Sequence, residues 1–110
     1  MSGSYELKQS DAGQFSFVLR AANGETILRS ERYESKDAAQ RGIASVQTNS
    51  PLEVRYAREV AVDGRYYFNL KAGNHQVIGT SQMYTSAQAR DGGIASVMQN
   101  GPTTAGTSGA

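Results

Sequence analysis

The run Gly-Ile-Ala-Ser-Val occurs twice in this chain, at 42–46 and at 93–97. The two copies lie 93 − 42 = 51 positions apart, and the same shift aligns further identical residues along the chain without a gap. The identical pairs include Tyr5 with Tyr56, Phe17 with Phe68, Tyr33 with Tyr84, and Asn49 with Asn100. The chain is therefore one unit of about fifty residues written twice, which indicates that one unit cannot cover its own apolar face.

Length sets the domain organisation. A chain of 110 residues fits a single domain, 1–110, whereas a unit of half that length is too small to bury a good core alone. We therefore expect repeat one, 4–51, and repeat two, 55–102, to share one core about a pseudo-two-fold axis. The tail, 103–110, holds only Thr, Ala, Gly and Ser, and this composition predicts disorder.

Strands are predicted where side chains alternate in character along the chain. Phe15, Phe17 and Leu19 lie on one side of such a strand, and Asn23-Gly24 after them favours a tight hairpin turn. The same pattern gives three strands in each repeat, at 5–9, 15–20 and 26–31 and at 55–62, 66–71 and 77–82.

A helix follows the strands of each repeat. Ser35 and Ser86 are good N-caps, because a serine hydroxyl can accept a hydrogen bond from a first-turn N–H. The first helix should end at Asn49-Ser50-Pro51, with Asn49 in the left-handed conformation and Pro51 unable to continue the helix. The order β-β-β-α, twice, predicts an α+β fold in which one six-stranded antiparallel sheet carries both helices on one face.

Gly42 and Gly93 stand inside these helices, where glycine costs about 1 kcal/mol relative to alanine. One explanation is close packing, because a residue without Cβ lets another backbone approach. The other is a ligand site lined by backbone. Packing is the favoured explanation, because a helical glycine usually has a packing reason.

Composition excludes several classes of function. Lys and Arg number 11 and Asp and Glu 10, so there is no strong attraction for duplex DNA, and the absence of cysteine rules out disulfides and thiolate chemistry. The start of the chain has no signal-peptide pattern, and no apolar run is long enough to span a bilayer. We expect a cytoplasmic monomer that does not engage a membrane.

No catalytic, cofactor-binding or metal-binding residues are predicted, and we expect a protein that is not an enzyme. His75 is the only histidine and falls in a predicted turn, so a transition-metal site lacks ligands. Ser45 and Ser96 have no base placed beside both of them, and small residues at a helix–helix contact explain them better. None of the carboxylates pairs with another across the shift of 51, so no symmetric acid–base pair is indicated.

One constellation suggests binding. Arg20 should lie on the outward face of the second strand, and the equivalent strand of repeat two carries three further candidates, Tyr67, Asn69 and Lys71. A tyrosine and two cations on an open sheet face can stack bases or bind a nucleic-acid strand. Mixed polar residues are also what a solvated sheet face contains, and the balanced charge favours that reading.

Several runs of residues, 23–28, 66–72 and 81–84, together with both Gly-Ile-Ala-Ser-Val copies, resemble the YegP-like family. The resemblance extends from Tyr5 to Asn100 and is to the duplicated bacterial form. It implies β-β-β-α units that share one sheet, and it supplies no catalytic residues. The biochemical function of the family is not established.

Two functions remain open. The first is a non-catalytic interaction module whose exposed sheet face or edge contacts another macromolecule, with protein favoured as the partner. The alternative is a weak single-stranded nucleic-acid binder that uses the same face. Both place Arg20, Tyr67, Asn69 and Lys71 at the contact.

Overall fold

The computed structural model describes residues 3–104 and 107–109. Strands and helices follow in the predicted order, and the second repeat differs mainly in strand length, since the strands predicted at 55–62 and 77–82 are shorter. The elements are β1 (Ser4–Gln9), β2 (Phe15–Arg20), β3 (Thr26–Ser30), α1 (Lys36–Asn49), the 3₁₀ helix η1 (Glu53–Arg55), β4 (Tyr56–Val60), β5 (Tyr66–Lys71), β6 (Val77–Thr80), α2 (Ala87–Asn100) and β7 (Ser108–Gly109).

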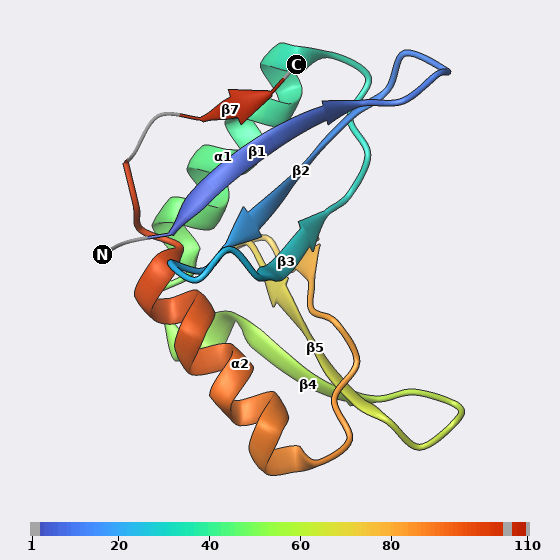
Figure 1. Ribbon diagram of the computed structural model, residues 1–110, viewed down its shortest axis with the longest axis vertical. Helices are drawn as coiled ribbons and strands as arrows, with labels where there is room; N and C mark the ends of the chain where they lie inside the picture. Colours follow the sequence, from blue (N-terminus) through green and yellow to red (C-terminus); the bar gives the residue numbers. More distant parts are fainter. Residues whose placement is uncertain (1–2, 105–106, 110) are drawn as a thin grey trace.

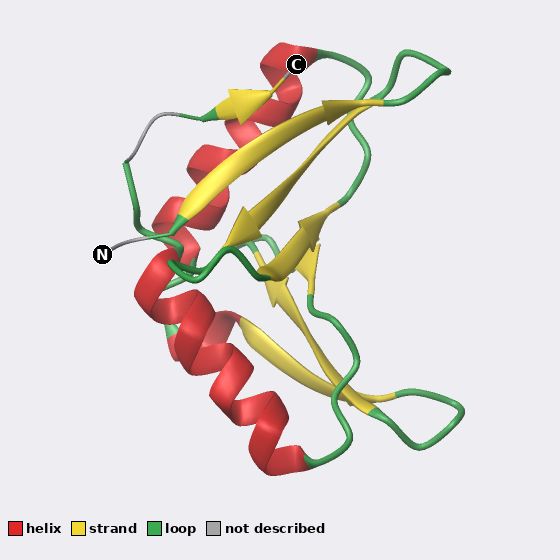
Figure 2. Ribbon diagram, in the orientation of Figure 1, coloured by secondary structure: helices red, strands yellow, loops and turns green. Residues whose placement is uncertain are grey.

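All the strands form one sheet, in the order β4-β5-β6-β3-β2-β1-β7. Six of them pair antiparallel, as predicted, but the sheet has a seventh strand, β7, which runs parallel to β1. The prediction of six strands, all antiparallel, is therefore wrong at this edge. The two outer hairpins, β1–β2 and β4–β5, diverge and carry their turns on the same side of the molecule (Figure 2).

The two repeats meet where β3 pairs with β6. Arg29 lies opposite Thr80, and 80 − 29 = 51, so each of these residues pairs with its own equivalent. An antiparallel pair of this kind has its two-fold axis perpendicular to the sheet, between the two residues. The predicted pseudo-two-fold axis therefore passes between Arg29 and Thr80.

The core lies between the sheet and the helices, which cover the same face (Figure 1). Each helix contacts strands of both repeats: α1 touches β2, β5 and β6, and α2 touches β5, β3 and β2. Phe17 is 1% exposed and Phe68 0%. Each phenylalanine meets one tyrosine edge-on and stacks on another, at centroid distances of 5.8 and 6.2 Å for Phe17 and 5.6 and 6.5 Å for Phe68.

Helix caps agree with the sequence at the start and differ at the end. The Ser35 and Ser86 hydroxyls each accept a hydrogen bond from the backbone N–H three residues on, at 3.0 Å. Asn49, however, is helical and not left-handed; its Nδ2 donates to the carbonyl of Ser45 at 2.8 Å, and the helix ends at Ser50 in the right-handed region. The amide of Asn49 therefore bonds back along its own helix instead of occupying a left-handed cap.

Packing explains Gly42 and Gly93. A Cβ on Gly42 would lie against the hydroxyl of Tyr33, and one on Gly93 would lie against the hydroxyl of Tyr84. The close neighbour is a tyrosine side chain in both repeats. The structure thus supports the packing explanation, with an aromatic ring in place of the backbone approach that the sequence suggested.

The C-terminal tail makes specific contacts where its composition predicted disorder. Thr103 is buried, and its carbonyl accepts a hydrogen bond from Nε2 of Gln47 at 2.8 Å. Ser108 and Gly109 lie beside Glu6 and Leu7 as β7. The tail's other residues at 105–106 and 110 lie outside the described part of the chain.

Candidate interaction surface

We call the sheet face turned away from the helices the outer face. A row of cross-strand neighbours crosses its centre, and we call it the central row: Ala57, Asn69, Thr80, Arg29, Val18 and Glu6. These residues alternate along their strands with core residues such as Phe17 and Phe68, so they point the other way. The sequence assigned Asn69 to this face correctly, and the same alternation places Arg20, Tyr67 and Lys71 on it.

Arg20 is held by its own strand neighbours. Its Nη2 atom forms an ion pair with Oε1 of Glu6 at 2.6 Å, and its Nη1 atom donates to Oγ1 of Thr26 at 3.2 Å and to the carbonyl of Gly24 at 3.3 Å. The hydrogen bond from Arg20 lowers the pKa of Glu6 below its usual range. The positive charge of Arg20 is therefore balanced locally.

The three candidates in repeat two lie on β5. Oδ1 of Asn69 accepts a hydrogen bond from the Thr80 hydroxyl at 2.8 Å, so this amide is tied into the central row. Tyr67 lies opposite Glu59 and is half-buried. Lys71 lies opposite Val77 at the other end of the strand, also half-buried.

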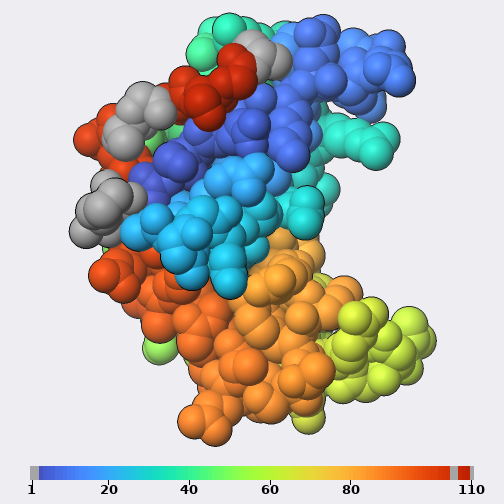
Figure 3. Space-filling model, viewed as in Figure 1, coloured from blue at the N-terminus to red at the C-terminus, as the bar shows by residue number. Residues whose placement is uncertain are grey.

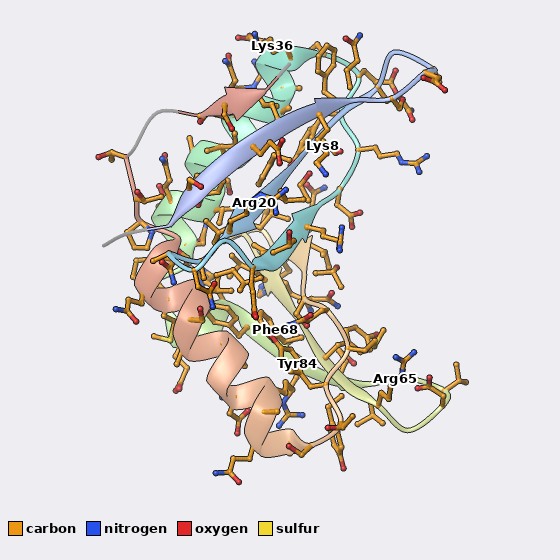
Figure 4. All side chains as sticks on the ribbon, in the orientation of Figure 1. Lys8, Arg20, Lys36, Arg65, Phe68 and Tyr84 are labelled. Carbon is orange, nitrogen blue, oxygen red and sulfur yellow. The ribbon has the colours of Figure 1, made fainter. Side chains whose placement is uncertain are left out.

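The four candidates do not form one cluster. Arg20 lies beside Thr26, before Arg29 on β3, and Lys71 lies beside Val77, before Thr80 on β6. Because β3 and β6 run in opposite directions, the two cations diverge from the axis and stand about 20 Å apart at the usual rise and spacing of strands. Figure 4 shows Arg20 on the β2 side of the sheet.

A second surface is an edge of the sheet, which the sequence analysis named beside the face without assigning residues to it. β4 is the outer strand of repeat two and pairs only with β5 in the described part of the chain, whereas its equivalent, β1, is covered by β7. Two valines flank this free edge: Val54 is 81% exposed and Val60 is 60% exposed. The turn beyond them, with the exposed Val62, projects from the molecule (Figure 3). In the sequence, the signal for this surface was the group of valines at 54, 60 and 62.

The histidine and serine side chains that the sequence raised for catalysis belong to different segments of the fold. His75 occupies an exposed turn with a positive φ of 70°, as the sequence suggested. The Ser45 hydroxyl lies 3.3 Å from Nδ2 of Asn49, a neighbour on its own helix. Within residues 3–104 and 107–109 there is no group of three or more His, Cys, Asp or Glu side chains arranged to hold a metal ion. In the part of the chain that the structure describes, no helix is long and apolar enough to cross a membrane.

The chain matches one family model twice, at 10–56 and at 61–105; the family is described as a domain of unknown function, DUF1508. These units begin 10 − 4 = 6 residues later than the repeat inferred from the sequence, so each runs from the turn before its middle strand to the segment after its helix. The starts of the two units differ by 61 − 10 = 51, the same shift that relates the repeats.

Curated relatives match over almost the whole chain. A UPF0339 protein of Shewanella oneidensis is 65% identical over 104 residues, which cover 94% of both chains. The UPF0339 protein YegP of Escherichia coli K12 is 60% identical over 101 residues, which cover 92% of both chains. Neither name states a biochemical function.

Solved structures give the same fold. The solution NMR structure of yegP from E. coli, described as a protein of unknown function, superimposes with a TM-score of 0.91 at 57% identity and covers 99% of this chain and 93% of that one. The solution NMR structure of a Shewanella oneidensis UPF0339 protein gives 0.91 at 62% identity, with 99% and 92% covered. The resemblance inferred from the sequence is confirmed: this chain belongs to the DUF1508 family of YegP-like UPF0339 proteins and carries the domain twice.

Proposed function

We propose that this protein is a non-catalytic interaction module that contacts another protein through its outer face. The observation that supports this is the pairing of Arg20 with Glu6 at 2.6 Å beside the central row. A nucleic-acid site needs cations that can replace the counterions of phosphates. A cation already neutralised by a neighbouring carboxylate favours a protein partner, whose surface presents both signs of charge.

Single-stranded nucleic acid is the second candidate. Arg29 is exposed at the centre of the outer face, and Tyr67 and Lys71 lie on the same face. A base can stack on a tyrosine while cations follow the backbone. These residues would then act as separate contacts along a strand, because the structure spreads them over the face.

Chemical-shift mapping of the labelled protein separates the two candidates. The probes are single-stranded RNA and DNA oligonucleotides and then cell lysate, each at two salt concentrations. Nucleic-acid shifts at Arg29 and Lys71 that fall steeply with salt would establish the alternative. Lysate shifts at Tyr67 and Asn69 that resist salt would support the protein partner.

A pair of variants tests the face directly. Tyr67→Ser removes the aromatic contact, and Ser16→Ala changes the equivalent position of repeat one, since 16 + 51 = 67. The proposal requires Tyr67→Ser to abolish the lysate shifts and Ser16→Ala to leave them. Shifts confined to turns and tail, with Tyr67 and Lys71 silent, would contradict both candidate functions.

A further inference from the structure

The free edge of β4 presents unpaired backbone groups. The N–H of Ala61 donates to the carbonyl of Arg65 at 2.8 Å, which fixes the hydrogen-bonded pairs of the β4–β5 hairpin. Since inward and outward groups alternate along an antiparallel strand, Ala57 and Glu59 bond to β5, whereas Tyr56, Arg58 and Val60 point their N–H and C=O groups outward. Such an edge is a template for another strand.

The equivalent edge of repeat one already accepts a strand. Glu6 and Leu7 of β1 lie beside Ser108 and Gly109 of β7, and their equivalents on β4 are Ala57 and Arg58, since 6 + 51 = 57 and 7 + 51 = 58. The same backbone geometry therefore pairs at one end of the sheet. The other end has no strand beside it in the part of the chain that the structure describes.

We propose that the β4 edge pairs antiparallel with β4 of a second copy of this chain, about a two-fold axis at Ala57. Ala57 then faces Ala57 of the second copy, and Tyr56 exchanges backbone hydrogen bonds with Arg58 in each direction. This uses outward-pointing groups on both strands. The axis is perpendicular to the sheet, as it is between Arg29 and Thr80 within one chain.

Charge and apolar surface select this register. Glu59 and Val60 of one copy then lie beside η1 of the other, which carries Arg55 and Val54, and the symmetry makes each contact twice. Nε of Arg55 donates to Oδ1 of Asn49 at 2.9 Å, which leaves its Nη groups for Glu59. Glu59 is half-buried at the edge, and the two valines are 81% and 60% exposed in the single chain. Val54 and Arg55 belong to η1, so their contacts flank the paired segment rather than extend it.

Neighbouring symmetric registers place like charges together. An axis at Arg58 sets Arg58 against itself, and an axis at Glu59 sets Glu59 against itself. An axis at Tyr56 sets Glu59 against Glu53. Like charges directly opposite each other destabilise a strand pair, whereas opposite charges and β-branched pairs stabilise it. Ala57 is small and uncharged and lies inside the strand, whereas an axis at Val60, the last residue of β4, would set most of the strand against the turn of the second copy.

The same arrangement is blocked at β1. Its central residue would be Glu6, the equivalent of Ala57, so two carboxylates would meet at the axis. β7 also covers this edge. Pairing through β4 alone gives a closed dimer, with the outer faces of both copies on one side of a continuous sheet. This inference goes beyond the proposed function, because it concerns the edge and a second copy rather than the outer face, and it replaces the monomer expected from the sequence.

A single cysteine tests the register, because the chain has none. In Ala57→Cys the two sulfurs would meet across a non-hydrogen-bonded pair, whose Cα separation of about 4.5 Å lies within the range for a disulfide. We expect rapid formation of a disulfide-linked dimer on mild oxidation. The control is Val62→Cys, whose thiol stands fully exposed on the hairpin turn and reports random collision.

Charge reversal tests the edge without a covalent bond. Sedimentation of the wild-type chain should show a dimer that grows with concentration, and Glu59→Arg should weaken it about tenfold by turning two attractive pairs into repulsive ones. The control, Lys8→Glu, reverses charge at the equivalent position of β1, since 8 + 51 = 59, and should leave the dimer unchanged. Tyr67→Ser should also leave it unchanged, which separates this inference from the proposed function.

Three results would overturn the inference. One is a wild-type chain that stays monomeric up to about 1 mM, a concentration at which even a pair worth about 4 kcal/mol would be half formed. The others are an Ala57→Cys chain that cross-links no faster than Val62→Cys, and a dimer that is indifferent to Glu59→Arg.

Discussion

Leu7 and Ala39 complete the core beneath the outer strand of repeat one, whereas their equivalents in repeat two, Arg58 and Arg90, are charged. Asp91 joins these two arginines, at 3.0 Å from Nε of Arg58 and 3.2 Å from Nε of Arg90. The Arg90 guanidinium lies over the Tyr66 ring, 5.5 Å from its centroid. The same two positions are thus filled by apolar packing in repeat one and by an ion-paired cluster in repeat two.

The two repeats keep the same residues around the two phenylalanines: Phe17 and Phe68 each contact two tyrosines, and Gly42 and Gly93 each accommodate a tyrosine hydroxyl. In the charged cluster the side chains of Arg58 and Asp91 are 39% and 50% exposed, so their ion pair keeps much of its hydration and the desolvation penalty is small. The arginine hydrogen bonds, with that of Arg58 foremost, lower the pKa of Asp91.

At the helix ends the two repeats differ because they share one space, and only one of them keeps a side chain there. Ser50 and Gly101 are equivalent residues, and a Cβ on Gly101 would collide with the side chain of Ser50. Ser50 is fully buried. Two serines do not fit where the C-terminal ends of α1 and α2 meet, so the symmetric site holds one serine and one glycine.

The largest expected effect tests whether the two cores are equivalent. Phe17→Ala and Phe68→Ala should each lower the free energy of unfolding by about 3–5 kcal/mol, because each removes a fully buried ring and leaves a cavity. Urea denaturation measures both. Equal losses would confirm that the cores respond as one; a loss of less than about 1 kcal/mol in either variant would mean that its repeat collapses around the gap.

Next come the helical glycines. Gly42→Ala and Gly93→Ala should each destabilise by about 1–3 kcal/mol, because the new methyl group meets a tyrosine ring held on the sheet. Gly92→Ala is the matched control: a Cβ there meets nothing within 4 Å, so the better helix propensity of alanine should stabilise by up to about 1 kcal/mol. Thermal melts of the three variants should show opposite shifts for neighbours Gly92 and Gly93.

The helix ends offer a swap. Gly101→Ser should destabilise by about 1–3 kcal/mol through the clash with Ser50. Adding Ser50→Gly should restore most of that loss, because the double variant exchanges the two equivalent residues. Denaturation of the two single variants and the double variant measures the coupling between these sites. Independent, additive effects would contradict the shared site.

Alkaline pH tests the first strand of each repeat. The Tyr5 hydroxyl donates to the Gly101 carbonyl at 2.6 Å, and the Tyr56 hydroxyl to the Ser50 carbonyl at 2.7 Å, so each tyrosine caps the C-terminal end of the other repeat's helix. Burial raises the pKa of both phenols above the usual value of 10.0. The unfolded chain then releases these protons first, so the stability is complete below pH 10 and is lost as pH rises towards the folded-state pKa.

The expected slope is about 1 kcal/mol per pH unit above 10 for each tyrosine, measured by urea denaturation between pH 9 and about 11. Tyr5→Phe and Tyr56→Phe should each remove one share of the slope and cost about 1 kcal/mol at neutral pH through the lost hydrogen bond. A slope unchanged in both variants would show that other groups cause it.

Much of the fold was readable from local patterns. Alternation gave six strands, Ser35 and Ser86 gave the helix starts, and the shift of 51 gave the symmetry, because each of these signals lies within a few residues or repeats in register. The register of β3 on β6 was not readable, since it joins segments from different repeats. That register decides where the axis lies and how far apart Arg20 and Lys71 stand.

For surface residues, the sequence predicted the face of the sheet but not the neighbouring side chains. Alternation placed Arg20 and Tyr67 on the outer face, but the partner of Arg20, Glu6, depends on how β1 aligns with β2. The tail was missed because composition measures how much a segment can bury. β7 pairs through backbone groups, and those are the same for any sequence without proline.

The parallel direction of β7 also follows from the repeat. Residues 107–109 are the equivalents of 56–58, since 56 + 51 = 107. Residues 56–58 belong to β4, the outer strand of repeat two, so the tail approaches the corresponding outer position in repeat one. In this half β1 already occupies that place beside β2, with Tyr5 and Leu7 buried in the core. Thr107 and Gly109 offer no comparable side chains. The tail therefore lies alongside β1 and runs in the same direction.

The smallest expected effect comes from removing β7, which leaves the β1 edge as open as the β4 edge. A chain that ends at Thr104 loses β7 but keeps the contact of Gln47 with Thr103. The loss of stability should be below about 1 kcal/mol, because two exposed residues are released together with the entropy of ordering the tail. Native-state hydrogen exchange is the sharper measurement. The outward amides of Tyr5 and Leu7 should lose protection, while β2 amides stay protected. Protection that persists at Leu7, or a loss near 3 kcal/mol, would mean that the tail stabilises β1 by more than edge pairing.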